Sequence, residues 1–242
     1  AYNGASDVTP ILSNYDILYV QAKGSVVRDL SYNFYTNIYT GADISVLSSH
    51  LFYGYSITEW AYAEEPFKCI WAIRNDGSTL CLTFVKEQEI IGWTHSDTNG
   101  LFKSVASVTE AVAQGDVDAV YFVIERTING NTVKYIERMA ERYFPNGVSD
   151  AWCVDAGLQY NSTPATSFSG AEHLAGASVV GLADGVAFTA TVSVTGTFTL
   201  ATAASKVTVG LAYTPQFQTL RADLGEPTVQ GKSKKISSIV AR

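Results

Sequence analysis

The chain has 242 residues, of which 23 are Asp or Glu and 16 are Lys or Arg, so its formal net charge is -7 at pH 7. This acidic balance argues against a general binder of nucleic acids or anionic membranes, because such surfaces need clustered Lys and Arg. Only 16% of the residues are charged and 12% are aromatic, which favours an all-β chain with a polar surface that suits a subunit of a larger assembly. No apolar run approaches the roughly 20 residues that span a bilayer, so no membrane segment is expected.

The first element expected along the chain is a hairpin. Two short strand candidates, Asp16–Gln21 and Ser25–Leu30, flank the turn dipeptide Lys23-Gly24. Short runs of β-branched and aromatic residues around such a turn are typical of paired antiparallel strands.

The period of the apolar residues changes between residues 40 and 52. Ile44, Leu47 and Leu51 recur there at helical spacing, which predicts one short helix. Thr40 or Asp43 is the expected N-cap, because both side chains can accept a hydrogen bond from the first turn.

The most informative stretch runs from residue 67 to residue 93, where Asn75-Asp76-Gly77-Ser78 joins two apolar runs. Asp-Gly between alternating apolar residues is a strong hairpin signal. With Asp76 and Gly77 as a two-residue loop, the expected cross-strand pairs are Ile73 with Leu80, Trp71 with Leu82, and Cys69 with Phe84. These six side chains would form one apolar face, and the other face would be mixed and partly covered.

The three cysteines are interpreted as free thiols. In the register above, Cys69 and Cys81 point to opposite faces of the hairpin, so a bond between them would break it. Cys153 then has no partner, and three is not the number of a disulfide framework. Free thiols fit synthesis in a reducing cytoplasm.

Further strands are expected after the central hairpin. Glu87–Trp93 reads as a strand, and Asp97–Gly100 turns it into a strand at residues 101–108. Asn129-Gly130 then predicts another two-residue hairpin loop, with the pairs Glu125 and Lys134, Ile124 and Tyr135, and Val123 and Ile136. Hairpins recurring in this way indicate meandering antiparallel sheets, as in propeller blades or a sandwich.

The composition shifts after residue 160. Asn161–Gly170 reads as a loop or linker, and residues 171–213 are rich in Val, Thr, Ala and Gly, with turns at Asp184-Gly185 and Thr195-Gly196. We therefore divide the chain into an antiparallel β body at 1–160, a small β-module at 161–213, and a connector with a final strand near Ile236–Val240 at 214–242.

The sequence contains no motif that assigns chemistry. His50, His95 and His173 lack the spacing of metal ligands, no cysteine pair has C-x-x-C spacing, and no phosphate-binding glycine motif or G-x-S-x-G occurs. We therefore assign no catalytic, cofactor-binding or metal residue, expect no cofactor, and do not expect an enzyme.

Two weaker alternatives stay open. The carboxylate pairs Glu64-Glu65 and Glu87/Glu89 would suit a glycosidase, although exposed carboxylates of this kind occur in any acidic protein. An aromatic platform would suit sugar stacking, although aromatic residues at alternating strand positions are more often core. Its members would be Trp60, Tyr62, Trp71, Trp93, Tyr53 and Tyr55. The basic cluster Lys232–Lys235 with Arg242 reads as solvated, and the sequon Asn161-Ser162-Thr163 is common by chance.

Several stretches taken together resemble a known family. One set is Ile17–Gln21 with Gly24–Leu30, Tyr39–Ile44 leading to His50–Phe52, and Trp60–Pro66. The other is Trp71–Arg74 with Asp76-Gly77, Glu87–Glu89 with Trp93, Glu125-Arg126, and Tyr135–Arg138. In this order and spacing, over about residues 4–242, they resemble the tail nozzle proteins of short-tailed bacteriophages, also called tail tubular protein B, and their prophage copies.

This resemblance implies a β-propeller body with inserted β-modules, copies arranged in a ring at the distal end of the tail, and a channel through which the genome leaves. Members are typically longer, so the chain is expected to be an interior or C-terminal part with too few hairpins to close a propeller. The family has no catalytic residues to transfer. Its members reside in the virion after synthesis in the cytoplasm of the bacterial host.

The expected fold is therefore all-β, with a partial propeller-like body, a small β-module and one short helix. The expected function is that of a structural phage tail component that contributes to a DNA-ejection conduit and to virion assembly. Its partners would be other tail subunits, further copies of itself and genomic DNA that passes without specific binding. A carbohydrate- or receptor-binding tail module is the first alternative, and a polysaccharide hydrolase is the second.

Overall fold

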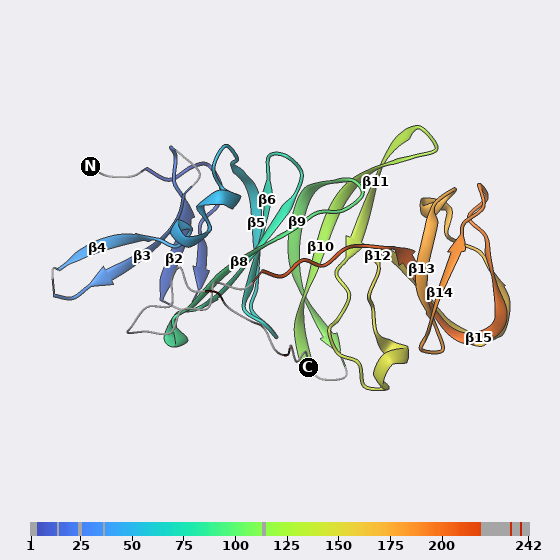
Figure 1. Cartoon of the computed structure of the whole chain (residues 1–242). Helices are drawn as coiled ribbons and strands as arrows, with labels where there is room; N and C mark the ends of the chain where they lie inside the picture. The colour runs from blue at the N-terminus through green and yellow to red at the C-terminus, as the bar shows by residue number, and fades with distance from the viewer. Residues whose placement is uncertain are drawn as a thin grey trace.

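The structure is a computed structural model that describes residues 4–13, 15–23, 26–35, 37–112 and 115–218, together with Ser233 and Ser238. It confirms an all-β chain of four antiparallel sheets, and the described strands do not close into a propeller. The sheets follow one another in chain order, from the blue N-terminal sheet to the orange fourth sheet (Figure 1). None of the described helices has the length and apolar character needed to cross a membrane.

The first sheet has the order β1-β2-β3-β4. Its strands are β1 at Ile11–Ser13, β2 at Asp16–Val20, β3 at Val27–Asn33 and β4 at Ile38–Asp43. Pairing of β2 with β3 confirms the first predicted hairpin, although Gly24 in its turn lies outside the described residues.

The predicted helix is shorter than expected and is a 3-10 helix, η1, at Val46–Leu51. Neither predicted N-cap residue occupies that position, because Thr40 and Asp43 both belong to β4 and Ser45 precedes the helix. The Asp43 carboxylate instead accepts hydrogen bonds from the backbone N–H and hydroxyl of Ser45, at 2.8 and 2.6 Å. Asp43 thus stabilises the turn that ends the strand.

The second sheet has the order β5-β6-β7-β8. Its strands are β5 at Ile57–Ala63, β6 at Cys69–Arg74, β7 at Thr79–Val85 and β8 at Ile90–Ser96. The predicted strand at residues 87–93 begins later than expected, because a short 3-10 helix, η2, occupies Lys86–Gln88.

The predicted register of the central hairpin is wrong by one residue. Trp71 pairs with Cys81, Ile73 with Thr79, and Cys69 with Thr83. The loop has three residues and not two, since the Arg74 N–H donates to the Ser78 carbonyl at 2.9 Å. Gly77, the last loop residue, has a φ of +83°, as three-residue hairpin loops require.

Because side chains alternate with period two, this shift moves every side chain of β7 to the opposite face relative to those of β6. Both faces are buried. One contributes Ile70, Ala72, Leu80, Leu82 and Phe84 to a core shared with the first sheet, which we call the first core. The other contributes Cys69, Trp71, Ile73 and Cys81 to a core shared with the third sheet, the second core. Cys69 and Cys81 therefore lie on the same face, contrary to the prediction.

The third sheet has the order β11-β10-β9, with β9 at Leu101–Val112, β10 at Gly115–Ile128 and β11 at Asn131–Arg138. The register predicted around Asn129-Gly130 is confirmed, including the pair Glu125 and Lys134. The predicted hairpin at Asp97–Gly100 is wrong, because β8 pairs with β7 and β9 pairs with β10. This turn carries the chain from the second sheet to the third.

The fourth sheet has the order β12-β15-β13-β14 and its own core, the third core. Its strands are β12 at Asp155–Phe168, β13 at Ser178–Ala183, β14 at Val186–Thr191 and β15 at Phe198–Leu211. Short 3-10 helices at Gly147–Asp150 (η3) and Glu172–Leu174 (η4) precede β12 and β13.

Two predictions for this region have different outcomes. The turn at Asp184-Gly185 is confirmed, since both residues have positive φ and join β13 to β14. The loop predicted from residue 161 is wrong as far as residue 168, because β12 continues through it and pairs with β15. β12 thus crosses the boundary drawn at residue 160, and the division into domains stays a prediction. The strand predicted near residues 236–240 lies outside the described residues.

Candidate functional site

The carboxylates considered for a glycosidase lie on exposed segments. Glu64, Glu65, Glu87 and Glu89 are all exposed. The Glu64 carboxylate lies 3.6 Å from the Lys68 ammonium. A general acid needs an enclosed environment that raises its pKa. Glu65 lines the cavity described below, but its side chain is exposed like those of the other three.

The six aromatic residues considered for sugar stacking do not form a platform. Trp60 is buried in the first core and Trp71 in the second, on opposite faces of the same sheet. The Trp60 indole N–H donates to the Thr9 carbonyl at 2.6 Å, and that of Trp93 donates to the Ile44 carbonyl at 2.9 Å. Tyr62 also packs against the first core. Only Tyr53 and Tyr55 are exposed.

The described residues contain no group of three His, Cys, Asp or Glu side chains that could hold a metal ion. His173 is used structurally, with its Nε2 atom 2.8 Å from the Ala156 carbonyl oxygen. The sequon at residues 161–163 lies on β12. Apart from Ser233, the basic cluster at 232–235 and Arg242 lie outside the described residues.

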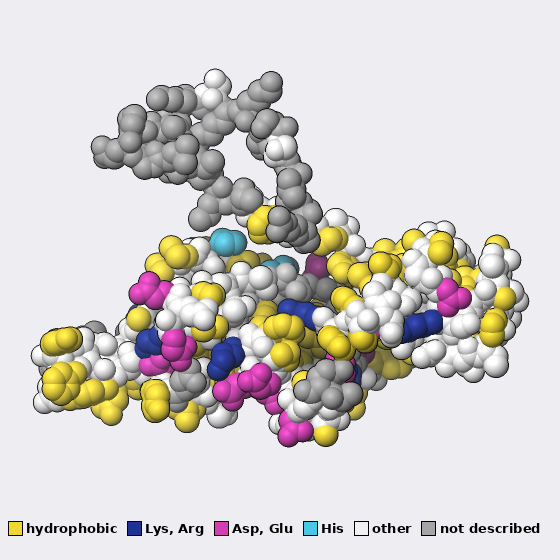
Figure 2. Space-filling model, turned by 90° about the horizontal axis from the view of Figure 1, so that it is seen from below, with side chains coloured by type: hydrophobic (Ala, Val, Ile, Leu, Met, Phe, Trp, Pro, Cys, Tyr) yellow, Lys and Arg dark blue, Asp and Glu magenta, His cyan; other side chains and the backbone are white. Residues whose placement is uncertain are grey.

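An exposed aromatic surface is the first candidate that the sequence analysis missed. It lies on the hairpin of β3 and β4 and comprises Tyr32, Phe34, Tyr35, Ile38 and Tyr39, which we call the aromatic hairpin. Phe34 is 81% exposed and Tyr35 is 97% exposed. The hairpin projects from the first sheet in Figure 1, and apolar side chains gather at the same end of the molecule in Figure 2.

Contacts between its own residues fix side chains of the aromatic hairpin. Tyr32 pairs with Tyr39 across the strands, with ring centroids 5.3 Å apart in an edge arrangement. The Tyr32 hydroxyl also hydrogen-bonds the Asn37 side chain. β4 is an edge strand of its sheet. Because exposed aromatic clusters and free strand edges are surfaces on which other chains pack, this hairpin can serve as an interaction surface. The signal in the sequence was the aromatic run SYNFYTNIY at residues 31–39, of which the sequence analysis used only Tyr39, as part of the resemblance.

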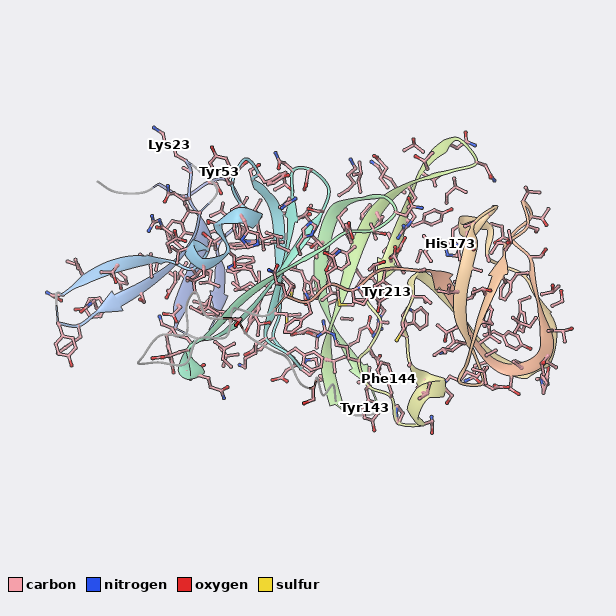
Figure 3. All side chains as sticks on the ribbon, viewed as in Figure 1. Lys23, Tyr53, Tyr143, Phe144, His173 and Tyr213 are labelled. Carbon is pink, nitrogen blue, oxygen red and sulfur yellow. The ribbon has the colours of Figure 1, made fainter. Side chains whose placement is uncertain are left out.

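A cavity of about 300 Å³ between the second and third sheets is another candidate. Its apolar wall includes Trp71, Val112, Val120 and Met139, and Cys69 lines it as well. The segment after β11 forms one side. Tyr143 is part of that side, and Figure 3 shows it with Phe144 near the lower ends of the third-sheet strands.

Charged groups surround this cavity without making it strongly acidic or basic. Arg138 is paired with Glu110 at 2.8 Å and with Glu141 at 3.2 Å. The Arg142 guanidinium lies 5.1 Å from the ring centroid of Phe67. The cavity therefore offers apolar contact area with the Arg142 cation as part of its wall.

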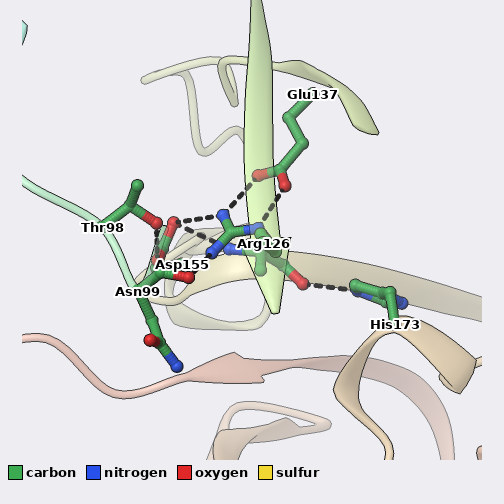
Figure 4. A network of polar contacts seen from close by, with 7 residues as sticks. Thr98, Asn99, Arg126, Glu137, Asp155 and His173 are labelled. Atoms are coloured by element: carbon green, nitrogen blue, oxygen red, sulfur yellow. Dashed lines mark hydrogen bonds and ion pairs between the residues drawn. The ribbon is translucent and has the colours of Figure 1, made fainter. Parts of the chain in front are cut away.

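The junction between the third and fourth sheets is polar. Arg126, on β10, is 3% exposed and donates two hydrogen bonds to the Glu137 carboxylate, at 2.6 and 2.8 Å (Figure 4). It also donates to the Asn99 carbonyl at 2.9 Å and lies 3.5 Å from the Asp155 carboxylate at the start of β12. The Thr98 hydroxyl donates to the same carboxylate at 2.6 Å.

The carboxylates around Arg126 act on its pKa. Burial lowers the pKa of Arg126, and its hydrogen bonds to Glu137 together with the charges of Glu137 and Asp155 more than offset this, so the net shift is upward. The charge of this buried guanidinium is neutralised by two carboxylates within the network. We therefore interpret Arg126 as a structural residue that links the third and fourth sheets.

No protein-family model matches this chain, and a comparison with curated proteins finds no match. The family that the sequence resembles therefore remains an expectation.

Proposed function

We propose that this chain is a structural virion component, a subunit of the tail nozzle of a short-tailed bacteriophage or prophage. In this role it contributes to the conduit through which the genome is ejected and to assembly of the virion. Its partners are other tail subunits and further copies of the full-length protein in a ring. It acts by shape and contact, and the proposal includes no catalysis and no cofactor.

The stacking of the sheets carries this proposal. The second sheet is buried on both faces, by the first sheet through the first core and by the third sheet through the second core. Successive antiparallel meanders packed face to face are how the blades of a propeller follow one another. The propeller-like character of the body is part of the proposal, and the missing blades would come from the remainder of a longer chain or from a neighbouring subunit.

The aromatic hairpin supports assembly into a larger particle. A free hairpin with Phe34 and Tyr35 almost fully exposed leaves apolar area in water, and covering it would contribute about 25 cal/mol per Å². Burial against a neighbouring subunit uses that area. The acidic net charge of -7 also suits a conduit, because like charge does not hold a passing polyanion.

The test is to locate the chain in particles. Phage particles induced from the source bacterium are purified and labelled with gold-conjugated antibody against this chain, and the label is expected at the tail tip. A matched pair of complemented phages, carrying Phe34→Ser with Tyr35→Ser or the control Val186→Ser in the fourth sheet, then tests the hairpin. We expect the first to yield fewer tailed particles. Particles without label, with the antigen left in the soluble cell extract, would refute the proposal.

A carbohydrate- or receptor-binding tail module is the second candidate, and the exposed tyrosines favour it. Tyrosine faces can stack on sugar rings, and Tyr32 and Tyr39 are held together by their edge contact. Binding to a glycan array that is lost in Tyr35→Ser and retained in Val186→Ser would support this candidate. Trp60 and Trp93 are unsuitable for this test, because both pack in the first core.

A further inference from the structure

The cavity between the second and third sheets continues the second core. Trp71 and Val120 are buried in that core and form part of the cavity wall. Ala63, Ala119 and Ala140 also line it, and their short side chains leave the space between the sheets unfilled. Protein interiors normally contain few voids larger than a water molecule. A volume of about 300 Å³ at this position is therefore space that a ligand can occupy.

Aromatic side chains line the cavity from its opening to its interior. Phe67 and Tyr143 belong to the wall and are about half exposed, so they lie where the cavity opens to solvent. Trp71 is buried further inside, in edge contact with Phe122 at a ring-centroid distance of 5.8 Å. Aromatic rings pack favourably in edge and offset contacts. An aromatic molecule in the cavity would therefore extend a chain of ring contacts that the second core already contains.

Met139 makes part of the cavity wall adaptable. Its side chain is partly buried, packs against the second core and lines the cavity. A methionine side chain is unbranched and can adjust to the shape of a bound molecule, and its sulfur makes favourable contacts with aromatic rings. Met139 and Trp71 thus supply two kinds of contact that both suit an aromatic ring.

The charged groups of the wall do not select an ionic ligand. The Asp118 carboxylate accepts hydrogen bonds from two backbone N–H groups, at 2.7 and 3.2 Å, and from the Thr109 hydroxyl at 3.0 Å. Arg138 is held by its two ion pairs. Arg142 and Glu65 are exposed to water and opposite in charge. An ion entering the cavity would lose its hydration against an apolar wall, which is costly, so the wall favours an uncharged ligand.

We propose that this cavity is a binding site for a small, uncharged aromatic molecule of one or two rings, which contacts Trp71 and Met139. The volume of about 300 Å³ lies at the lower end of the range for small-molecule sites and limits the ligand to this size. The inference rests on the shape and the wall of the cavity, and it is independent of the proposed tail function.

The test uses the single methionine of the chain as a reporter. Met139 is the only methionine in the sequence and lines the cavity, so ¹³C-labelling of the methionine methyl group gives one signal from the cavity wall of the unsubstituted chain. The probe is indole, an uncharged two-ring molecule. We expect indole to shift this signal saturably with a Kd below about 1 mM. We also expect nuclear Overhauser effects between the indole ring protons and the Met139 methyl protons.

Charged analogues of indole test the class of ligand. Indole-3-acetate is an anion and tryptamine is a cation at neutral pH, and 3-ethylindole is an uncharged molecule of similar size. We expect 3-ethylindole to bind at least about tenfold more tightly than either ion, because only the ions lose charge hydration in the cavity. Equal or tighter binding of either ion would overturn the assignment to uncharged ligands.

A pair of variants tests whether the cavity itself is the site. Ala63→Leu enlarges a side chain of the wall and should weaken indole binding at least about tenfold. Ala203→Leu makes the same change at an exposed position of β15 and should leave binding unchanged. Undiminished binding in folded Ala63→Leu would overturn the proposal. The unsubstituted chain decides the question without any variant, since a Met139 signal that does not move up to the solubility limit of indole would refute the site.

Discussion

The junctions between successive sheets are built in two different ways. The first three sheets are joined by shared apolar cores, in which Leu80 and Leu82 face one neighbour and Trp71 and Ile73 face the other. The fourth sheet keeps its apolar residues in its own core and meets the third through the Arg126 network. The edge contact between Tyr135 and His173, with ring centroids 6.0 Å apart, adds to that junction.

This difference indicates which parts of the chain are expected to unfold together. An apolar core shared by two sheets cannot be divided without exposing it, so the first three sheets should behave as one cooperative unit. A charge network depends on geometry and can be broken by one substitution while the apolar core of the fourth sheet stays intact.

The largest effect is expected from the first core. Leu82 is fully buried there, and Leu82→Ala should lower the free energy of unfolding by about 2–5 kcal/mol. Urea unfolding measured by tryptophan fluorescence checks this, because the first two sheets contain three of the four tryptophans, Trp60, Trp71 and Trp93. Val186→Ala, at a site that is 70% exposed, serves as the control with little change. A loss below about 1 kcal/mol for Leu82→Ala would mean that the two sheets do not share a core.

The next effect is expected at the polar junction. Arg126→Met leaves the Glu137 and Asp155 carboxylates without their cation, and we expect a loss of about 3 kcal/mol. The fourth sheet should then separate from the third, so that limited proteolysis cuts within residues 140–154 faster than in the parent. Arg126→Lys keeps the charge but loses the paired hydrogen bonds, and it should fall between the two. Unchanged proteolysis in Arg126→Met would show that other contacts hold the junction.

A smaller effect is expected from Lys86, whose ion pairs cross the apolar junction of the first two sheets. The Lys86 ammonium lies 2.6 Å from the Asp16 carboxylate and 3.0 Å from the Asp29 carboxylate, and both carboxylates are buried. Lys86→Met removes their cation and should cost about 2 kcal/mol. The double variant with Asp29→Asn should recover part of that loss in the same urea experiment. No recovery would place the contribution of Lys86 in its aliphatic contacts.

The smallest effect concerns the turn that sets the register of the second sheet. Hydrogen bonds from Arg74 lower the pKa of Asp76 in the folded chain, and those from Ser78 add to this. A carboxyl group whose pKa is lowered on folding stabilises the folded chain at pH values above its unfolded pKa of about 4. This stabilisation is lost as the pH falls below that value. In Asp76→Asn, unfolding free energy should therefore fall less between about pH 5 and about pH 2 than in the parent. An identical pH profile in both proteins would contradict this role.

The turns show which features of a hairpin can be predicted from the local sequence. Asn129-Gly130 forms the predicted two-residue loop, the predicted turn at Asp184-Gly185 has the same length, and all four residues have positive φ. Asp76-Gly77 has the same chemistry but forms a three-residue loop, because the Asp76 carboxylate bonds both Arg74 and Ser78. The dipeptide predicts a hairpin in each case, and side-chain contacts beyond it decide the register.

The long strand β12 shows a second feature that could not be predicted from the local sequence. Residues 161–168 are rich in Ser and Thr and include a proline, which is the composition of a loop. They form a strand because the distant strand β15 provides a pairing partner, from Asn161 with Lys206 to Phe168 with Phe198, with shifts in register along the way. Pairing with a distant segment outweighs local composition here.

The sequence by itself determined the all-β class and most of the strand pairings between neighbours, since a hairpin depends on residues close together in the chain. Only the tertiary structure decided that both faces of the central hairpin are buried, that Cys69 and Cys81 share a face, and that Trp60 and Trp71 belong to separate cores. The aromatic hairpin and the Arg126 junction were likewise set by the fold. Burial is a property of two surfaces that meet, and the partner of each surface here comes from a distant part of the chain.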